Sequence, residues 1–445
     1  MIDTRSLGSN TPIEHKRIVI IGNGYVGHHF CQKILELQEQ NRHELVVFSE
    51  EKIPAYDRLA LANFCQHRTP DRLLLSPFNW YEKHGIKLHL TDRVLKIDRT
   101  RKQVLSSRGV IEDYDHVVLA TGSYSYVPPI AGIDQPGVHL FRTLDDMEEI
   151  IADRPHCRSV AVIGGGLFGL EAARAVSELG LETHIIESNS WVMHHQLDET
   201  GSSFLKDLIE SQGVQIHLNK QTSKILSNNK RVCGLQFQDQ SRLEVDMVIF
   251  AAGIRPRDEL ARICQLQIHE TGGVVVNNQL QTSDPNIFAI GKGAHHPDIE
   301  CGLVSPGLQM ADVLASNLCG IPTEFCGIEQ AVKRNVLGVD VACFGNQIFS
   351  DQNFESVTYR DPNRGIYRKL FINPQGTQIL GGILIGDTTD YDFLLSLMKS
   401  QQTLTSPIDD LLKNKTGSTE EANLKSSQQK IESADPTKKV TRRIL

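Results

Sequence analysis

The sequence predicts an α/β protein with two tandem Rossmann-like units, a small α+β C-terminal domain and a disordered tail. Two segments carry this prediction, because each has a short apolar run, a G-x-G-x-x-G motif and then a helical pattern. They span residues 17–27 and 159–169. Each is followed by a second apolar run that ends in an acid, Glu50 in the first unit and Glu187 in the second. One such motif is a weak signal, but two copies in the same surroundings indicate two dinucleotide-binding units.

The three glycines of each motif have separate physical roles. The first permits a tight turn, the second lets the backbone approach a pyrophosphate, and the third lets helix and strand pack closely. The following helix points its unpaired N–H groups and the positive end of its dipole at the phosphates. The acid accepts hydrogen bonds from ribose hydroxyls. Glu187 also repels a 2′-phosphate and no arginine follows it in "SNSWVMHHQ", so NADH is predicted over NADPH.

The rest of the chain completes four predicted regions. The apolar runs at 115–122 and 246–253 end in Ala-Thr-Gly and Ala-Ala-Gly, small turns that let the backbone lie against a dinucleotide. The stretch "TSDPNIFAIG" and a helix-like segment after it return to the first unit. Short alternating strands predict the third domain, and a polar composition predicts the tail, with a helical remnant near "SPIDDLLKN". We expect a first dinucleotide-binding domain at 16–150 plus 275–325, a second at 151–274, an interface domain at 326–400 and a polar tail at 401–445.

Composition excludes several classes of protein. The net charge of −8 argues against a nucleic-acid partner, which would need a basic face. No apolar run is long enough for a transmembrane helix, so no membrane partner is expected. The nine scattered cysteines form no C-x-x-C pair, which predicts reduced thiols and a cytoplasmic location. The histidine doublets at 28–29, 194–195 and 295–296 lack metal-ligand spacing, so we expect no metal site.

Four further stretches give the chain a family resemblance. They are Ala55-Tyr56-Asp57-Arg58, the segment "WYEKHGI" from Trp80, "ATGSY" from Ala120 and "GIRPR" from Gly253. Together with the tandem units, they resemble the two-dinucleotide-binding flavoprotein reductases. The likeness is greater to the NADH-oxidising N-terminal part of assimilatory nitrite reductase large subunits, and to the small electron-transfer subunit of assimilatory nitrate reductases. It covers residues 16–400.

This resemblance implies cofactors, partners and site residues. FAD would lie on the first unit and NADH on the second, with electrons passing to a nitrate reductase catalytic subunit or another redox protein. Hydride transfer to the flavin needs no acid–base catalyst, so we expect no catalytic acid or base in this chain. The expected cofactor-binding residues of the first unit are Gly22, Asn23, Gly24, Val26, Gly27, Glu50, Arg58, Ala120, Thr121, Gly122, Gly291 and Lys292. Those of the second unit are Gly164, Gly165, Gly166, Leu167, Gly169, Glu171, Glu187 and Gly253.

Some of these assignments have alternatives. Arg58 could instead form an ion pair with Asp57 or Glu51, and Glu171 could serve as a helix-dipole partner. The helix that opens at residues 305–307 should point at the flavin pyrimidine, where its positive end would stabilise the anionic reduced flavin.

The sequence also departs from the resemblance in three places. Relatives of the nitrite reductase type continue into cysteine-rich iron–sulfur and sirohaem domains, so we expect this chain to be only an electron-input module. The C-x4-C pair of disulfide reductases is absent, since Cys65 has no partner at position 60 or 70. Lys292 stands where relatives place a carboxylate that binds the ribityl chain. A ribityl hydroxyl can turn from donor to acceptor, so our hypothesis is that FAD still binds, but more weakly.

Two other functions remain open. One is an NADH reductase for a rubredoxin- or ferredoxin-like carrier, which would share the same three domains. The other is a flavin-free binding or regulatory subunit, supported only by Lys292 and the "GAHH" that follows it. The sequence leaves the oligomeric state open.

Overall fold

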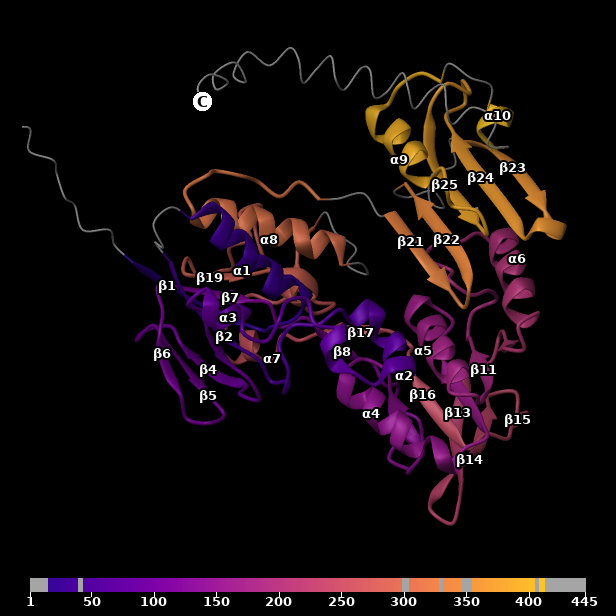
Figure 1. The fold of residues 1–445 in the computed structure, drawn as a ribbon, viewed down its shortest axis with the longest axis horizontal. Helices are drawn as coiled ribbons and strands as arrows, with labels where there is room; N and C mark the ends of the chain where they lie inside the picture. The colour runs from indigo at the N-terminus through magenta and orange to yellow at the C-terminus, as the bar shows by residue number, and fades with distance from the viewer. Residues whose placement is uncertain are drawn as a thin grey trace, which may run out of the picture.

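A computed structural model describes residues 15–38, 43–297, 304–327, 331–345, 354–404 and 408–412. Three five-stranded sheets organise these residues (Figure 1). Two of them are parallel and the third is antiparallel. This architecture confirms the predicted α/β fold class.

The first sheet is built from the first glycine-rich unit and a strand that returns much later in the chain. Its strand order is β19-β7-β1-β2-β3. The strands are β1 (Lys16–Ile21), β2 (His43–Phe48), β3 (Lys87–His89), β7 (His116–Leu119) and β19 (Ile287–Ala289). Helix α1 (Tyr25–Leu37) packs beside α8 (Ser305–Leu318) over this sheet (Figure 1). Residues 287–318 therefore complete the unit that residue 16 begins.

A small antiparallel sheet and several short elements extend the first unit. The sheet contains β4 (Val94–Asp98), β5 (Gln103–Ser106) and β6 (Ile111–Asp113). The short elements are η1 (Arg58–Asn63), α2 (Phe64–His67), η2 (Pro70–Arg72), α3 (Trp80–Lys83), α7 (Glu259–Ile263), β18 (Val274–Val275), η4 (Gly291–Gly293) and β20 (Ala294–His295).

The second sheet repeats the arrangement, with the order β12-β11-β10-β16-β9. Its strands are β9 (Val138–Leu140), β10 (Ser159–Ile163), β11 (Glu182–Ile186), β12 (Gln215–His217) and β16 (Met247–Phe250). Its helices are α4 (Leu144–Asp153), α5 (Leu167–Glu178) and α6 (Glu199–Glu210), with a turn η3 (Arg154–His156). A three-stranded sheet of β13 (Thr222–Asn228), β14 (Arg231–Phe237) and β15 (Arg242–Leu243) lies beside it. Strand β9 precedes residue 151 in the chain, yet it pairs with β16 of this second sheet.

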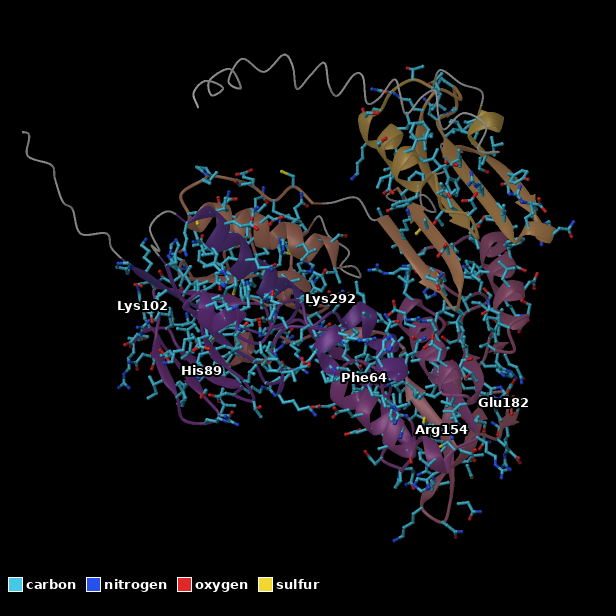
Figure 2. All side chains as sticks on the ribbon, viewed as in Figure 1. Phe64, His89, Lys102, Arg154, Glu182 and Lys292 are labelled. Carbon is cyan, nitrogen blue, oxygen red and sulfur yellow. The ribbon has the colours of Figure 1, made fainter. Side chains whose placement is uncertain are left out.

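Two crossings of the chain join the first two units. Strand β8 (Ser123–Ser125) pairs antiparallel with β17 (Ile254–Pro256), so the outgoing and returning connections are hydrogen-bonded to each other. Phe64 of α2 is buried in the hydrophobic cluster of the second unit. Figure 2 shows Phe64 between His89 of the first unit and Arg154 of the second. The junction is therefore packed and not a loose linker.

The third sheet has the order β21-β22-β25-β24-β23. Its elements are β21 (Ala331–Val336), β22 (Val339–Phe344), β23 (Glu355–Asp361), η5 (Pro362–Arg364), β24 (Ile366–Ile372), β25 (Ile379–Ile385), α9 (Tyr391–Ser400) and α10 (Ile408–Leu412). The buried Arg368 donates to Asp387 and Asp390, at 2.7 Å each.

The start of the expected polar tail belongs to this third sheet's core. Helix α10 confirms the helical remnant predicted near "SPIDDLLKN". Leu411 and Leu412 are buried in the hydrophobic cluster that covers the sheet, because burying their side chains removes apolar surface from water. The sequence did not indicate this, since the residues around the two leucines are mostly polar. Residues 413–445 of the expected tail lie outside the described residues.

Candidate functional site

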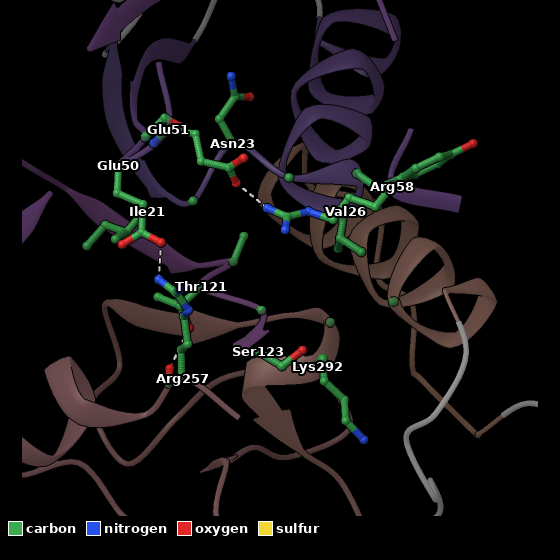
Figure 3. Close-up of a pocket in the computed structure, with 18 of the residues that line it drawn as sticks. Ile21, Asn23, Val26, Glu50, Glu51, Arg58, Thr121, Ser123, Arg257 and Lys292 are labelled. Carbon is green, nitrogen blue, oxygen red and sulfur yellow. Dashed lines mark hydrogen bonds and ion pairs between the residues drawn. The ribbon is translucent and has the colours of Figure 1, made fainter. Parts of the chain in front are cut away.

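A pocket lies at the carboxyl ends of β1, β2 and β7, where parallel sheets commonly bind ligands (Figure 3). It brings together eleven of the twelve residues that the sequence assigned to the first unit's cofactor. These lining residues are Gly22, Asn23, Gly24, Val26, Glu50, Arg58, Ala120, Thr121, Gly122, Gly291 and Lys292. They come from four separate stretches of the chain, residues 22–26, 50–58, 120–122 and 291–292, which the fold brings together.

The first glycine-rich turn shows why each glycine stands where it does. Gly22 has φ of +116°, and a Cβ there would collide with the carbonyl oxygen of Ala120. A Cβ at Gly27 would collide with the carbonyl oxygen of Gly22, so this glycine serves helix packing and does not line the pocket. Nothing lies within 4 Å of a Cβ built at Gly24, which faces open space in the pocket. The open space at the second glycine fits a phosphate group.

The second turn has the same geometry. Gly164 has φ of +118°, and its Cβ would lie 2.5 Å from the carbonyl oxygen of Ala251. A Cβ at Gly169 would collide with the carbonyl oxygen of Gly164, whereas Gly166 again faces open space. Leu167 begins α5, so its N–H is one of the helix's unpaired donors.

Glu187 closes the second turn from the end of β11. Its carboxylate accepts from the backbone N–H of Gly165 at 2.7 Å, and from the backbone and side chain of Asn189 at 2.8 and 2.7 Å. A Cβ on Gly165 would lie 2.9 Å from this carboxylate. The acid is thus held rigidly beside the turn. Gly253 follows strand β16, which pairs with β10, and has φ of +118°.

Two acids at the end of β2 are paired with arginines inside the first pocket. Glu50 forms an ion pair with Arg257, which reaches it from the returning connection (Figure 3). Glu51 forms an ion pair with Arg58. Arg58 therefore makes the ion pair with Glu51 that we gave as its alternative role, and it also lines the pocket. Any ribose bound to Glu50 would have to share that carboxylate with Arg257.

Sequence reasoning missed Arg142, which lines the same pocket. Its guanidinium donates to Ser123 Oγ at 2.7 Å and lies over the ring of Phe168, 5.6 Å from the centroid. Burial, and then the nearby Arg58, lower the pKa of Arg142 to about 10. Its Nε is buried without a hydrogen-bond partner among the described residues. No motif marks Arg142, since only the fold brings it to the pocket.

The remaining predicted residues occupy different places. Lys292 lies in η4 and lines the pocket half-buried, and Figure 3 shows its side chain extending away from Glu51. Helix α8 begins at Ser305, and its Gly307 lines the pocket, so its N-terminus faces this site. Glu171 is 9% exposed on α5 and does not line the pocket. Burial raises the pKa of the Glu171 carboxyl to about 7.

The histidines and cysteines do not form a metal centre in the part of the chain that the structure describes. His28 is buried, with its ring nitrogens 2.8 Å from Tyr81 Oη and 2.9 Å from Ser76 Oγ. Burial lowers the pKa of His28 to about 4. No helix among the described residues is long and apolar enough to cross a membrane.

Comparison with known proteins decides the family. Residues 12–311 match the family model described as pyridine nucleotide-disulphide oxidoreductase. The chain belongs to this family. Residues 333–402 match the C-terminal domain of rubredoxin NAD+ reductase. The predicted family of two-dinucleotide-binding oxidoreductases is confirmed.

Sequence relatives agree with the resemblance. The chain is 40% identical over 383 residues to the large subunit of nitrite reductase (NADH) from Escherichia coli, covering 86% of this chain and 45% of that protein. It is 35% identical over 395 residues to the assimilatory nitrate reductase electron transfer subunit of Bacillus subtilis, covering 88% of this chain and 50% of that protein. The chain thus spans about half the length of these relatives.

Solved structures share the fold. A ferredoxin reductase from Rhodopseudomonas palustris has a TM-score of 0.79 at 24% identity, covering 88% of this chain and 96% of the other. NADH:rubredoxin oxidoreductase from Clostridium acetobutylicum has a TM-score of 0.72 at 23% identity, covering 90% and 100%. At these identities the likeness concerns the fold alone.

Proposed function

We propose that this protein oxidises NADH and passes the electrons through FAD to a redox protein, with a nitrate or nitrite reductase catalytic component as the leading acceptor. The observation that carries the proposal is the pair of matched glycine-rich turns at the ends of two parallel sheets. The first turn opens into a pocket that also contains Phe168, a residue of the second turn's helix. A ligand in the first pocket can therefore touch the second unit.

The residues of the first pocket fit FAD. The open space at Gly24 can take the pyrophosphate, and the N-terminus of α8 supplies positive potential for the reduced ring. The buried Nε of Arg142 offers a donor to a negatively charged group. Glu50 is placed to hold the adenosine ribose once it exchanges its contact with Arg257. Arg58 and Thr121 complete the edges of the proposed site.

The residues of the second turn fit NADH. Gly166 leaves open space for the pyrophosphate of the nicotinamide dinucleotide. Glu187 is fixed by three hydrogen-bond donors and presents a negative charge to the ribose. A free 2′-hydroxyl can donate to this carboxylate, whereas a 2′-phosphate is repelled. The second unit therefore favours NADH over NADPH.

The chain contributes binding, orientation and electrostatics to this reaction. FAD held by these residues would supply the chemistry that the side chains lack, which is acceptance of a hydride and donation of electrons one at a time. Phe168 and Arg142 line the side of the pocket nearest the second unit and limit the position of a bound ring. The packed junction between the units holds the two dinucleotides at a fixed separation.

The expected domain division accompanies this proposal. Residues 16–150 plus 275–325 form the FAD-binding domain, 151–274 the NAD-binding domain, 326–400 the interface domain and 401–445 the tail. The second sheet takes β9 and α4 from the end of the first range. We place the protein in the cytoplasm, which is consistent with the buried free thiols of Cys31, Cys65 and Cys157.

The acceptor separates the proposal from its nearest alternative. The match of residues 333–402 to a rubredoxin NAD+ reductase domain favours a small iron protein as the second candidate. The test is NADH consumption by the FAD-loaded protein with either a nitrate or nitrite reductase catalytic component or a rubredoxin- or ferredoxin-type carrier. We expect faster electron transfer to the former. Faster transfer to the iron protein establishes the alternative, and failure to bind FAD leaves the flavin-free regulatory subunit.

A further inference from the structure

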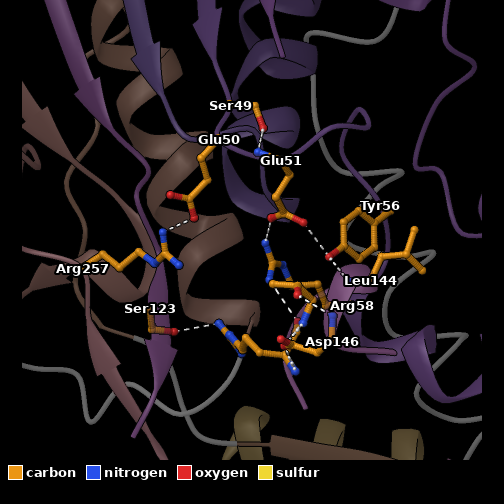
Figure 4. A network of polar contacts seen from close by, with 11 residues as sticks. Ser49, Glu50, Glu51, Tyr56, Arg58, Ser123, Leu144, Asp146 and Arg257 are labelled. Carbon is orange, nitrogen blue, oxygen red and sulfur yellow. Dashed lines mark hydrogen bonds and ion pairs between the residues drawn. The ribbon is translucent and has the colours of Figure 1, made fainter. Parts of the chain in front are cut away.

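We propose that Tyr56 and Glu51 are positioning residues for FAD, because they hold Arg142 in the pocket through contacts with its backbone and with α4. This inference rests on the proposed function. Neither residue belongs to the glycine-rich motif, and Tyr56 does not line the pocket. Figure 4 shows the network that connects them.

The hydroxyl of Tyr56 joins the end of β2 to the start of α4. It donates to Glu51 Oε2 at 2.7 Å and accepts from the backbone N–H of Leu144 at 3.1 Å. Leu144 is the first residue of α4, where N–H groups have no partner within the helix. Tyr56 is only 3% exposed, so water is not available to replace either bond. One buried hydroxyl therefore fixes the N-terminus of α4 relative to the first unit.

Glu51 helps to fix Arg142, which lies two residues before that helix begins. Its other oxygen, Oε1, forms an ion pair with Arg58 Nη2, and Arg58 Nη1 donates to the backbone carbonyl of Arg142 at 3.1 Å. The backbone N–H of Arg142 donates to Asp146 at 2.9 Å. Arg142 is thus held at both backbone polar groups, and its carboxyl-side neighbour Thr143 caps α4 in a capping box.

The network holds the positive charge of Arg142 in the pocket without a carboxylate partner among the described residues. Four arginines line the pocket, and they are Arg58, Arg93, Arg142 and Arg257. Arg58 pairs with Glu51 and Arg257 pairs with Glu50, but Arg142 has no carboxylate partner among the described residues. Its Nε is buried and without a partner there. A buried, unpaired cation is costly and favours an anionic ligand.

The consequence is a division of roles among these residues. Arg142 would contact the negative charge of the bound dinucleotide, on the diphosphate or the reduced ring. Tyr56 would act only through Arg142, by fixing the backbone that carries it, whereas Glu51 would act through both Arg58 and Arg142. Removing the Tyr56 hydroxyl would therefore weaken FAD binding only while Arg142 is present.

A double-mutant cycle tests this dependence. The dissociation constant for FAD is measured by flavin fluorescence for wild type, Tyr56→Phe, Arg142→Met and the double variant, and unfolding of each FAD-free protein is followed in urea. We expect each single variant to bind FAD about tenfold more weakly. The double variant should be no weaker than Arg142→Met alone. Tyr114→Phe is the matched control, since Tyr114 is a buried tyrosine of the first unit that does not line the pocket. This variant should bind FAD as tightly as wild type.

Two results would overturn the inference. If the two single losses multiply in the double variant, Tyr56 acts independently of Arg142. If Tyr56→Phe changes only the urea midpoint and binds FAD like Tyr114→Phe, its role is purely structural. Wild-type protein that fails to bind FAD would instead overturn the proposed function, and the inference with it.

Discussion

Replacing Gly24 with alanine should separate cofactor binding from folding. The φ of Gly24 is −87°, and its Cβ would have nothing within 4 Å, so the FAD-free protein has no strain to absorb. Its free energy of unfolding should change by less than about 1 kcal/mol, because the smaller entropy of the unfolded chain is offset by the poorer N-cap that alanine makes at the start of α1. The new methyl group would occupy the space proposed for the pyrophosphate. Losing one charge-assisted contact there costs roughly 1.5–3 kcal/mol, or about 10- to 150-fold in FAD affinity.

The assay is FAD titration of the Gly24→Ala protein, with urea unfolding of the FAD-free form as the check on folding. Gly166→Ala is the matched control, because this glycine faces open space at the second turn. It should weaken NADH binding and leave FAD affinity unchanged. A Gly24→Ala protein that binds FAD within twofold of wild type would refute the proposed location of the pyrophosphate.

Three other predictions concern single side chains. Glu187→Ser should raise KM for NADH roughly tenfold or more and reduce the preference for NADH over NADPH, because the ribose loses a carboxylate acceptor. An unchanged ratio of the KM values for NADPH and NADH would contradict this. Burial raises the pKa of Glu171 to about 7 from the ordinary 4.5, so the folded state retains this proton longer than the unfolded state. The free energy of unfolding of the FAD-free protein should therefore fall as pH rises from about 4.5 to 7. The Glu171→Gln variant should not show this fall, and urea unfolding at pH 8 should find it on the order of 2 kcal/mol more stable than wild type. Parallel wild-type and variant pH profiles would refute this. Lys292→Glu should tighten FAD binding up to about tenfold, and equal dissociation constants would count against a weakened ribityl contact.

The sequence revealed the parts of the site that depend on local backbone geometry. Gly22 and Gly164 need positive φ and close approach, and such needs leave a short motif in the chain. The acids Glu50 and Glu187 follow the motifs at the end of a second strand, so their positions were also predictable. The stretch "TSDPNIFAIG" also predicted the return of the chain to the first unit, and β19 within it pairs with β7.

Contacts between distant segments could not be predicted in this way. Arg257 meets Glu50 from 207 positions further along the chain, and no local pattern marks that pair. Arg142 was missed for the same reason, since its place depends on how α4 follows the crossing between units. Strand β9 lies before the second glycine-rich motif but pairs with β16 of the second sheet, and no local pattern in the sequence marks this pairing.

Anaerobic titration of the FAD-loaded protein with NADH tests the proposed reaction most directly. The two matched turns and the shared pocket predict that one equivalent of NADH bleaches the oxidised flavin absorbance, and that NADPH does so far more slowly. Protein that takes up no flavin, or holds flavin that NADH leaves oxidised, would contradict the proposed transfer of electrons from the second unit to the first.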